Sequence, residues 1–71
     1  MANKPTLKAL RRQARLSVTQ LSRLSGVATD TIKRAEAGEA VREMSALKIL
    51  ETLNARLGTS YEPEDLNIPI G

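Results

Sequence analysis

The 71-residue sequence contains no cysteine and no histidine. Without cysteine, the chain can form neither a disulfide framework nor a Cys-based zinc site. Without histidine, acid–base catalysis near neutral pH lacks its usual side chain. No apolar run approaches the roughly 20 residues that cross a bilayer, and the opening MANKPTLKAL lacks the apolar stretch of a secretory signal. These absences predict a cytoplasmic protein with no membrane segment, metal or cofactor, and without enzymatic activity.

Aromatic residues are almost missing, since Tyr61 is the only one. The core must therefore be built from Leu, Ile, Val and Ala, which recur at helical spacing up to residue 57. A chain of this length forms one small domain at most. The sequence predicts an all-α fold: a compact bundle of four to five helices.

Charge is divided unevenly along the chain. Residues 1–34 contain eight Lys and Arg against one acid, Asp30, which gives +7, whereas residues 35–71 contain three basic and seven acidic residues, which gives −4. The sum is the net +3 of the whole chain. A concentration of positive charge favours an anionic partner. The alternative is an ordinary solvated basic face.

The first two helices have recognisable boundaries. Apolar spacing predicts the first helix over about residues 5–15. Ser17 and Gln20 fit the capping box that begins a second helix, and Gly26 is suited to end it in the left-handed conformation. Within this second helix, Leu21 and Leu24 are expected to face the core.

Two further helices follow. The third is expected over residues 28–37, with Ala28, Ile32 and Ala35 facing inward. The fourth is expected over residues 44–57. Its predicted apolar face consists of Met44, Leu47, Leu50, Leu53 and Leu57.

The last part of the chain differs from the rest. Residues 1–58 are predicted to form the helical domain, and residues 59–71 a short extended or one-turn tail. Pro63 could begin one helical turn, after which Leu66, Ile68 and Ile70 alternate with other residues. Two alternatives stay open for these apolar residues: they pair with helix four of a second copy, or they cover the chain's own core.

The second and third helices are joined by the tight sequence Ser-Gly-Val, which is the layout of a helix-turn-helix. In that motif the second helix enters the major groove. The outward face of the predicted third helix has Thr29, Asp30, Lys33 and Arg34, which we expect to reach base edges. Arg34 or Lys33 suits guanine, and Asp30 can accept from cytosine. Asp30 could instead simply complement the helix dipole, and a plain helical hairpin is the alternative for the whole motif.

Glu36 lies four residues after Ile32, so it points partly toward the interior. A semi-buried carboxylate needs a partner. Arg11 lies on the inward side of the first helix, and we expect the two to form a structural ion pair. The alternative is that each side chain reaches solvent separately.

Four sequence patterns occur in a family-specific order: L..LR from Leu7, LS...L from Leu16, GV...TI.R.E.G from Gly26, and L..L..LG from Leu50. Through them residues 7–58 resemble the Cro/phage-repressor, or xenobiotic-response-element, type of helix-turn-helix domain. The resemblance implies a helical bundle whose third helix reads DNA. It also implies a buried arginine–glutamate pair, which falls on Arg11 and Glu36.

The sequence departs from the family pattern at three positions. Val18 stands where glutamine often contacts a phosphate, Ala28 where a polar cap is usual, and Ala37 where asparagine is common. The expected phosphate contacts are therefore assigned to Ser17, Thr19, Gln20 and Arg42.

The prediction is a sequence-specific regulator of transcription, of the repressor kind, that binds double-stranded DNA as a weak homodimer. The alternative is an antitoxin-like or adaptor module that binds a protein partner, which the acidic and apolar tail favours.

Overall fold

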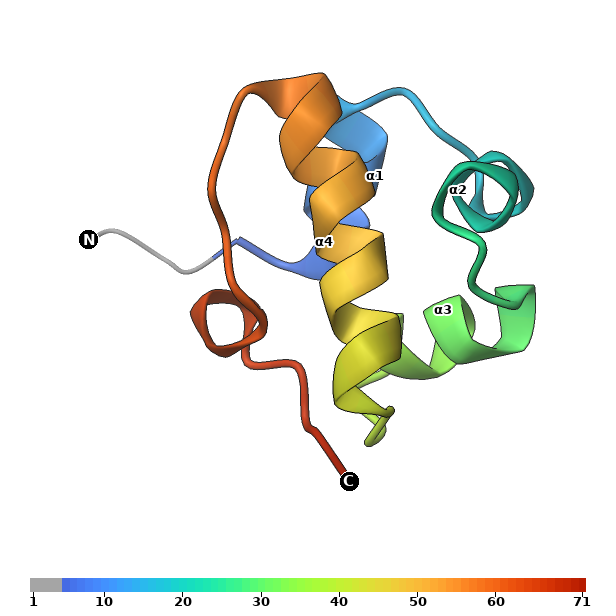
Figure 1. Cartoon of the computed structure of the whole chain (residues 1–71), viewed down its shortest axis with the longest axis vertical. Helices are drawn as coiled ribbons and strands as arrows, with labels where there is room; N and C mark the ends of the chain where they lie inside the picture. The colour runs from blue at the N-terminus through green and yellow to red at the C-terminus, as the bar shows by residue number, and fades with distance from the viewer. Residues whose placement is uncertain (1–4) are drawn as a thin grey trace.

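The computed structural model describes residues 5–71, so the first four residues of the predicted domain lie outside it. Within this range the fold has no β-strand. It consists of α1 (Leu7–Gln13), α2 (Val18–Ser25), α3 (Thr29–Glu36), α4 (Glu43–Leu57) and a 3-10 turn, η1 (Pro63–Leu66). In Figure 1, α4 crosses the centre of the molecule and lies in front of α1. Helices α2 and α3 lie together on one side of α4, and the tail returns along the other side. The predicted all-α bundle is confirmed.

Side-chain caps and residues in the left-handed conformation mark where the first two helices begin and end. The Thr6 hydroxyl accepts from the Ala9 amide at 3.1 Å and begins α1 two residues later than predicted. Arg15, at φ 59°, is already left-handed, so α1 also ends earlier than residue 15. The capping box of α2 is confirmed by reciprocal bonds between Ser17 and Gln20, and Gly26 ends the helix at φ 75°.

One apolar core joins all the elements. Its fully buried large side chains are Leu10, Leu21, Ile32, Ile49, Leu50 and Leu53. In α4 the buried face is Ala46, Ile49, Leu50 and Leu53, which follows the spacing of three, four and seven residues that keeps side chains on one stripe.

The predicted inward faces were wrong at four positions: Leu24, Ala28, Met44 and Leu47 are exposed. An α-helix turns by about 100° per residue, so each three-residue step falls about 60° behind the previous side chain. The predicted series Met44, Leu47 and Leu50, in which each residue follows the last by three positions, therefore begins on the surface and reaches the core only at Leu50. Leu24 lies three residues after buried Leu21 and is displaced in the same way. Ala28 occupies the cap before α3, where the backbone is still extended.

The tail packs against the helices. Leu66 and Ile68 belong to the core cluster, whereas Ile70 is exposed. Val41, between α3 and α4, donates its amide to the Pro69 carbonyl at 3.0 Å and accepts from the Gly71 amide at 3.1 Å. Leu66 and Ile68 therefore contribute to this chain's own core, while the division of the chain at residue 58 stays a prediction.

Candidate nucleic-acid interface

The turn between α2 and α3 is held by two serines. Ser22 Oγ donates to the Val27 carbonyl at 2.6 Å, and Ser25 Oγ donates to the Leu21 carbonyl at 2.7 Å. Ser25 Oγ also accepts from the Val27 amide at 3.3 Å. These bonds satisfy polar backbone groups in a tight turn and so fix where α3 begins relative to α2. Neither serine was predicted from the sequence. The available signal was that they lie four and seven residues after Val18, and therefore on the same face of α2 as this residue, which packs against the core.

α3 is anchored on one side and open on the other. Ile32 and Ala35 are buried in the core. Of the predicted base-contacting residues, Asp30, Lys33 and Arg34 are exposed and Thr29 is half-buried. The structure thus brings these four side chains onto one eight-residue helix, away from its buried stripe.

The N-terminus of α3 lacks a side-chain cap. Ala28 makes no capping hydrogen bond, and the first amides of a helix have no partner within the helix. Asp30 lies in this first turn, where a carboxylate complements the positive end of the helix dipole. This geometry is compatible with both roles considered for Asp30.

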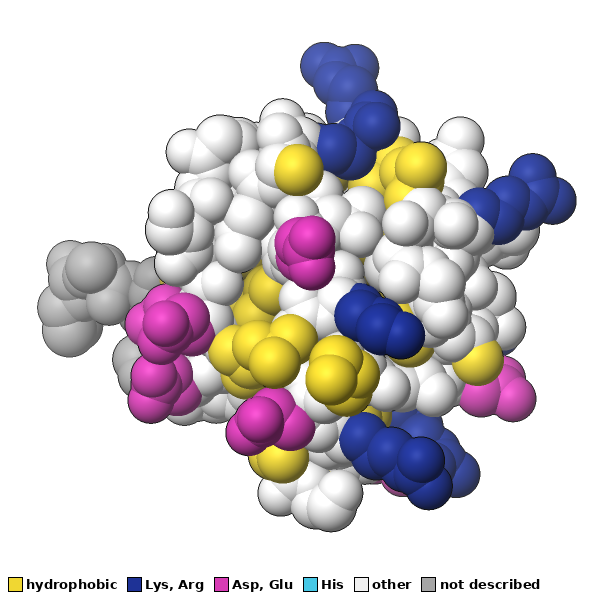
Figure 2. All heavy atoms as spheres, in the orientation of Figure 1, with side chains coloured by type: hydrophobic (Ala, Val, Ile, Leu, Met, Phe, Trp, Pro, Cys, Tyr) yellow, Lys and Arg dark blue, Asp and Glu magenta, His cyan; other side chains and the backbone are white. Residues whose placement is uncertain are grey.

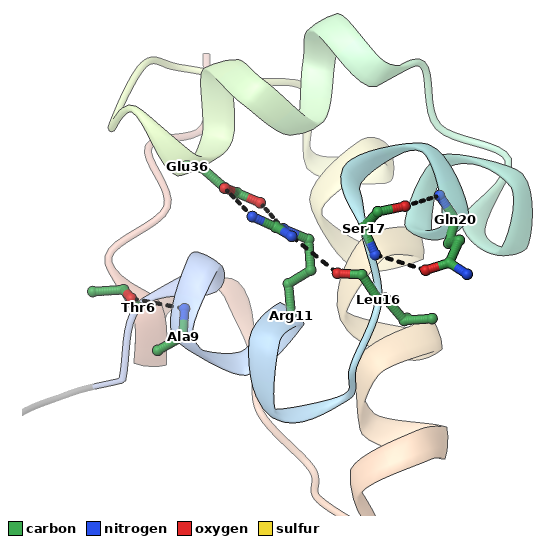
Figure 3. Close-up of polar contacts among 7 residues, drawn as sticks. All are labelled: Thr6, Ala9, Arg11, Leu16, Ser17, Gln20 and Glu36. Atoms are coloured by element: carbon green, nitrogen blue, oxygen red, sulfur yellow. Dashed lines mark hydrogen bonds and ion pairs between the residues drawn. The ribbon is translucent and has the colours of Figure 1, made fainter.

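Arg11 and Glu36 lie in direct contact. Arg11 Nε donates to Glu36 Oε2 at 2.7 Å, and its Nη2 donates to Glu36 Oε1 at 3.3 Å. Nη1 donates to the Leu16 carbonyl at 2.9 Å. The two side chains are only 12% and 11% exposed. As Figure 3 shows, the guanidinium links α1, the connection to α2 and the last residue of α3, so it fixes the orientation of α3 from its C-terminal end.

The predicted phosphate-contacting residues lie in two places. Ser17, Thr19 and Gln20 are exposed at the start of α2. The capping box uses the Ser17 hydroxyl as an acceptor and the Gln20 carbonyl oxygen as an acceptor, so the Ser17 O–H and the Gln20 NH2 remain as donors. Arg42 lies apart from them, at the cap of α4.

Arg42 shares a shallow hollow with Arg34. The hollow is also lined by Thr31, Ala40, Val41, Ser45 and Gly71. Figure 2 shows Lys and Arg side chains beside the α3–α4 connection. Because the Val41 backbone is bonded to the tail, the segment that carries Arg42 is held in place next to α3.

The side of the molecule formed by the tail, away from α2 and α3, is acidic, as the magenta side chains there in Figure 2 show. The pKa of Glu62 is raised, first by a hydrogen bond with Glu64 and then by repulsion from Glu64 and Asp65. These carboxylates would be repelled by phosphates. The arrangement therefore favours the α2–α3 side as the one that approaches nucleic acid.

Neither a metal site nor a membrane segment is found in the part of the chain that the structure describes. No group of three or more His, Cys, Asp or Glu residues in residues 5–71 could hold a metal ion. In the same range no helix combines the length and apolar character that crossing a membrane requires.

Two short helices joined by a serine-held turn, with a polar outer face on the second, form a helix-turn-helix. The family model described as "Helix-turn-helix domain" matches residues 6–60. The chain therefore belongs to this family, which is part of the Cro/C1-type, or xenobiotic-response-element, group of DNA-binding domains. Domains of this family are generally non-enzymatic. No curated protein and no solved structure matches the chain significantly.

Proposed function

We propose that this protein is a sequence-specific regulator of transcription that inserts α3 into the major groove of double-stranded DNA. The observation that carries the proposal is the outer face of α3, where three exposed polar side chains and half-buried Thr29 stand opposite a buried stripe. A protein that occupies its DNA site excludes competitors from it, so we propose that the regulator is a repressor. Because its proposed partner is DNA, we also propose that the protein is cytoplasmic.

The proposed contacts divide into two kinds. Lys33 or Arg34 donates to guanine, Thr29 contacts a neighbouring base edge, and Asp30 accepts from cytosine if it is not simply a dipole partner. These contacts would specify sequence, since each base pair presents its own pattern in the major groove.

Contacts to phosphates would fix the register of the helix on the duplex without reading sequence. We assign them to the free donors of Ser17, Thr19 and Gln20 and to the guanidinium of Arg42. The proximity of Arg42 to Arg34 around one hollow supports this assignment. A phosphate held there would lie beside the base that Arg34 reads.

We also propose weak pairing on DNA. A single small module buries only about 600–1,000 Å² and reads few base pairs, so two copies on a two-fold symmetric site would raise specificity. The sequence predicts this pairing through α4 and residues 61–70. Because Leu66 and Ile68 are used in the chain's own core, we propose pairing that depends on DNA and involves little protein surface.

Selection of bound sites from random duplex DNA tests this function. The expected result is an enriched motif that occurs as two symmetric half-sites, together with retention on heparin and steep elution by salt. Recovery of no motif, with early elution from heparin, would contradict the proposal. Such a result would favour the alternative, an antitoxin-like or adaptor module, for which a groove lined by residues of α4 and the tail is the supporting observation.

A further inference from the structure

A groove of about 450 Å³ lies between α4 and the tail. It is lined by Glu43, Leu47, Glu62, Pro63, Glu64, Ile68 and Ile70, and we call it the α4–tail groove. Figure 2 shows hydrophobic side chains grouped over this part of the surface, with acidic side chains beside them.

Two large apolar residues that line the α4–tail groove, Leu47 and Ile70, are exposed, whereas Ile68 at its floor is buried in the core. Leu47 is 43% exposed and Ile70 is 46% exposed, and neighbouring Met44 is 63% exposed. Apolar side chains gathered at one hollow, rather than scattered singly, are typical of an interaction site. DNA does not fit this place, because three glutamates line the groove and would be repelled by phosphates.

The charge of the lining points to a cationic occupant. Three of the seven lining residues are glutamates and none is Lys or Arg. The pKa of Glu62 is raised by a hydrogen bond with Glu64 and by repulsion from Glu64 and Asp65, and a positive group close to these carboxylates would relieve the repulsion. Arg42 and Lys48 are the neighbours in sequence of Glu43 and Leu47, and neither lines the groove.

A second copy of this chain fits the groove poorly. Two-fold pairing places the same patch of both copies together, so the glutamates of one groove would face those of the other. A stable protein–protein interface also buries about 800 Å² per partner, roughly a sixth of the 4741 Å² surface of this chain. A groove lined by seven residues is better matched to a short segment than to a whole domain.

We propose that the α4–tail groove binds a short segment of a partner protein that combines Leu- or Ile-like side chains with Lys or Arg. The apolar side chains of the segment cover Leu47 and Ile70, and its cations pair with Glu62 and Glu64. The groove is separate from the outer face of α3, so this inference does not depend on the proposed DNA binding.

A random peptide library displayed on phage, selected against the full chain without DNA, tests the proposal. Enriched peptides are expected to contain both basic and aliphatic residues. One such peptide is then synthesised and titrated into the chain by calorimetry. Leu47→Ser is expected to weaken its binding about tenfold, which corresponds to about 1.4 kcal/mol, whereas Leu24→Ser, which changes another exposed leucine, on α2 and outside the groove, leaves it unchanged.

Charge reversal supplies a second variant pair. Glu64→Lys is expected to weaken binding about tenfold, and Glu39→Lys, which alters an exposed glutamate outside the groove, is expected to have no effect. Failure to enrich any peptide, enrichment of acidic or uncharged peptides, or equal binding by all four variants would each overturn the proposal. A dimer that forms without DNA and is broken by Leu47→Ser would overturn it in favour of a second copy.

Discussion

Glu36→Ala is expected to lower the free energy of unfolding by about 2–3 kcal/mol. The substitution removes both carboxylate oxygens that accept from Arg11, at 2.7 and 3.3 Å. It leaves Arg11, whose side chain is only 12% exposed in the structure, with one remaining protein acceptor, the Leu16 carbonyl at 2.9 Å.

The magnitude follows from how far Arg11 is buried. Breaking a fully buried ion pair by removal of one partner costs about 3–5 kcal/mol, because the remaining charge is desolvated without compensation. Here Arg11 keeps the Leu16 bond and some contact with water, so the expected cost is smaller. For a domain of this size, about 2–3 kcal/mol corresponds to a fall of roughly 10–20 °C in Tm.

Urea denaturation followed by circular dichroism measures the effect, with Glu39→Ala as the control. Glu39 is exposed and forms no salt bridge in the described residues, so its removal should change the unfolding free energy by less than about 0.5 kcal/mol. A double-mutant cycle with Arg11→Ala should give a coupling energy within about 0.5–3 kcal/mol. Equal urea midpoints for Glu36→Ala and Glu39→Ala, or a coupling energy near zero, would refute the reasoning.

Four further substitutions test other parts of the structure. Leu66→Ala should lower the unfolding free energy by about 2–3 kcal/mol because Leu66 is buried in the core, whereas Ile70→Ala should change it by less than about 0.5 kcal/mol; equal losses in chemical denaturation would contradict the difference. Ala28→Ser should raise Tm by supplying the absent cap of α3, a gain of about 0.5–1 kcal/mol, and an unchanged Tm would show that serine makes no cap there. The pKa of Glu62 is raised, so folding disfavours the charged form of this side chain. The stability that the protonated Glu62 contributes is present at pH values below the ordinary carboxyl range, and it is lost as pH rises through the raised pKa. Glu62→Gln should therefore be at least as stable as the unchanged chain at neutral pH and lose any advantage in acid; the opposite pH trend in thermal melts would contradict this.

Local signals were enough to locate the helices. Ser17, Gln20 and Gly26 mark the ends of α2 through bonds and backbone angles that involve only neighbouring residues, so the sequence itself contains the information. The proximity of Arg11 to Glu36 was also expected from side-chain direction, since each lies on the inward side of its helix.

Features that depend on distant contacts were not predictable in the same way. Which of the apolar residues in α4 are buried depends on the elements packed against that helix, and the choice of Met44 and Leu47 over Ala46 and Ile49 was wrong. The pairing of Val41 with the tail joins segments nearly thirty residues apart through backbone groups, which have no signature in the side-chain pattern.

Hydroxyl and amide side chains with structural roles were missed for a related reason. Ser22 and Ser25 bond the turn before α3, and Asn54 binds the Tyr61 backbone through both its Nδ2 and its Oδ1. A polar residue on an inward stripe is the only sequence signal of such a role, and its partner becomes apparent only when the backbone is in place.

The comparison of Arg34→Ala with Arg42→Ala on DNA tests the central claim most directly. Both residues are exposed and line one hollow, but only Arg34 lies on α3. With a site obtained by selection, Arg34→Ala should lower the affinity for that site by about 1–3 kcal/mol and relax one base position, with little effect on random DNA. Arg42→Ala should weaken binding to both DNAs alike and reduce the salt slope by about one. If Arg34→Ala weakened binding to selected and random DNA equally, α3 would not read bases and the account would be contradicted.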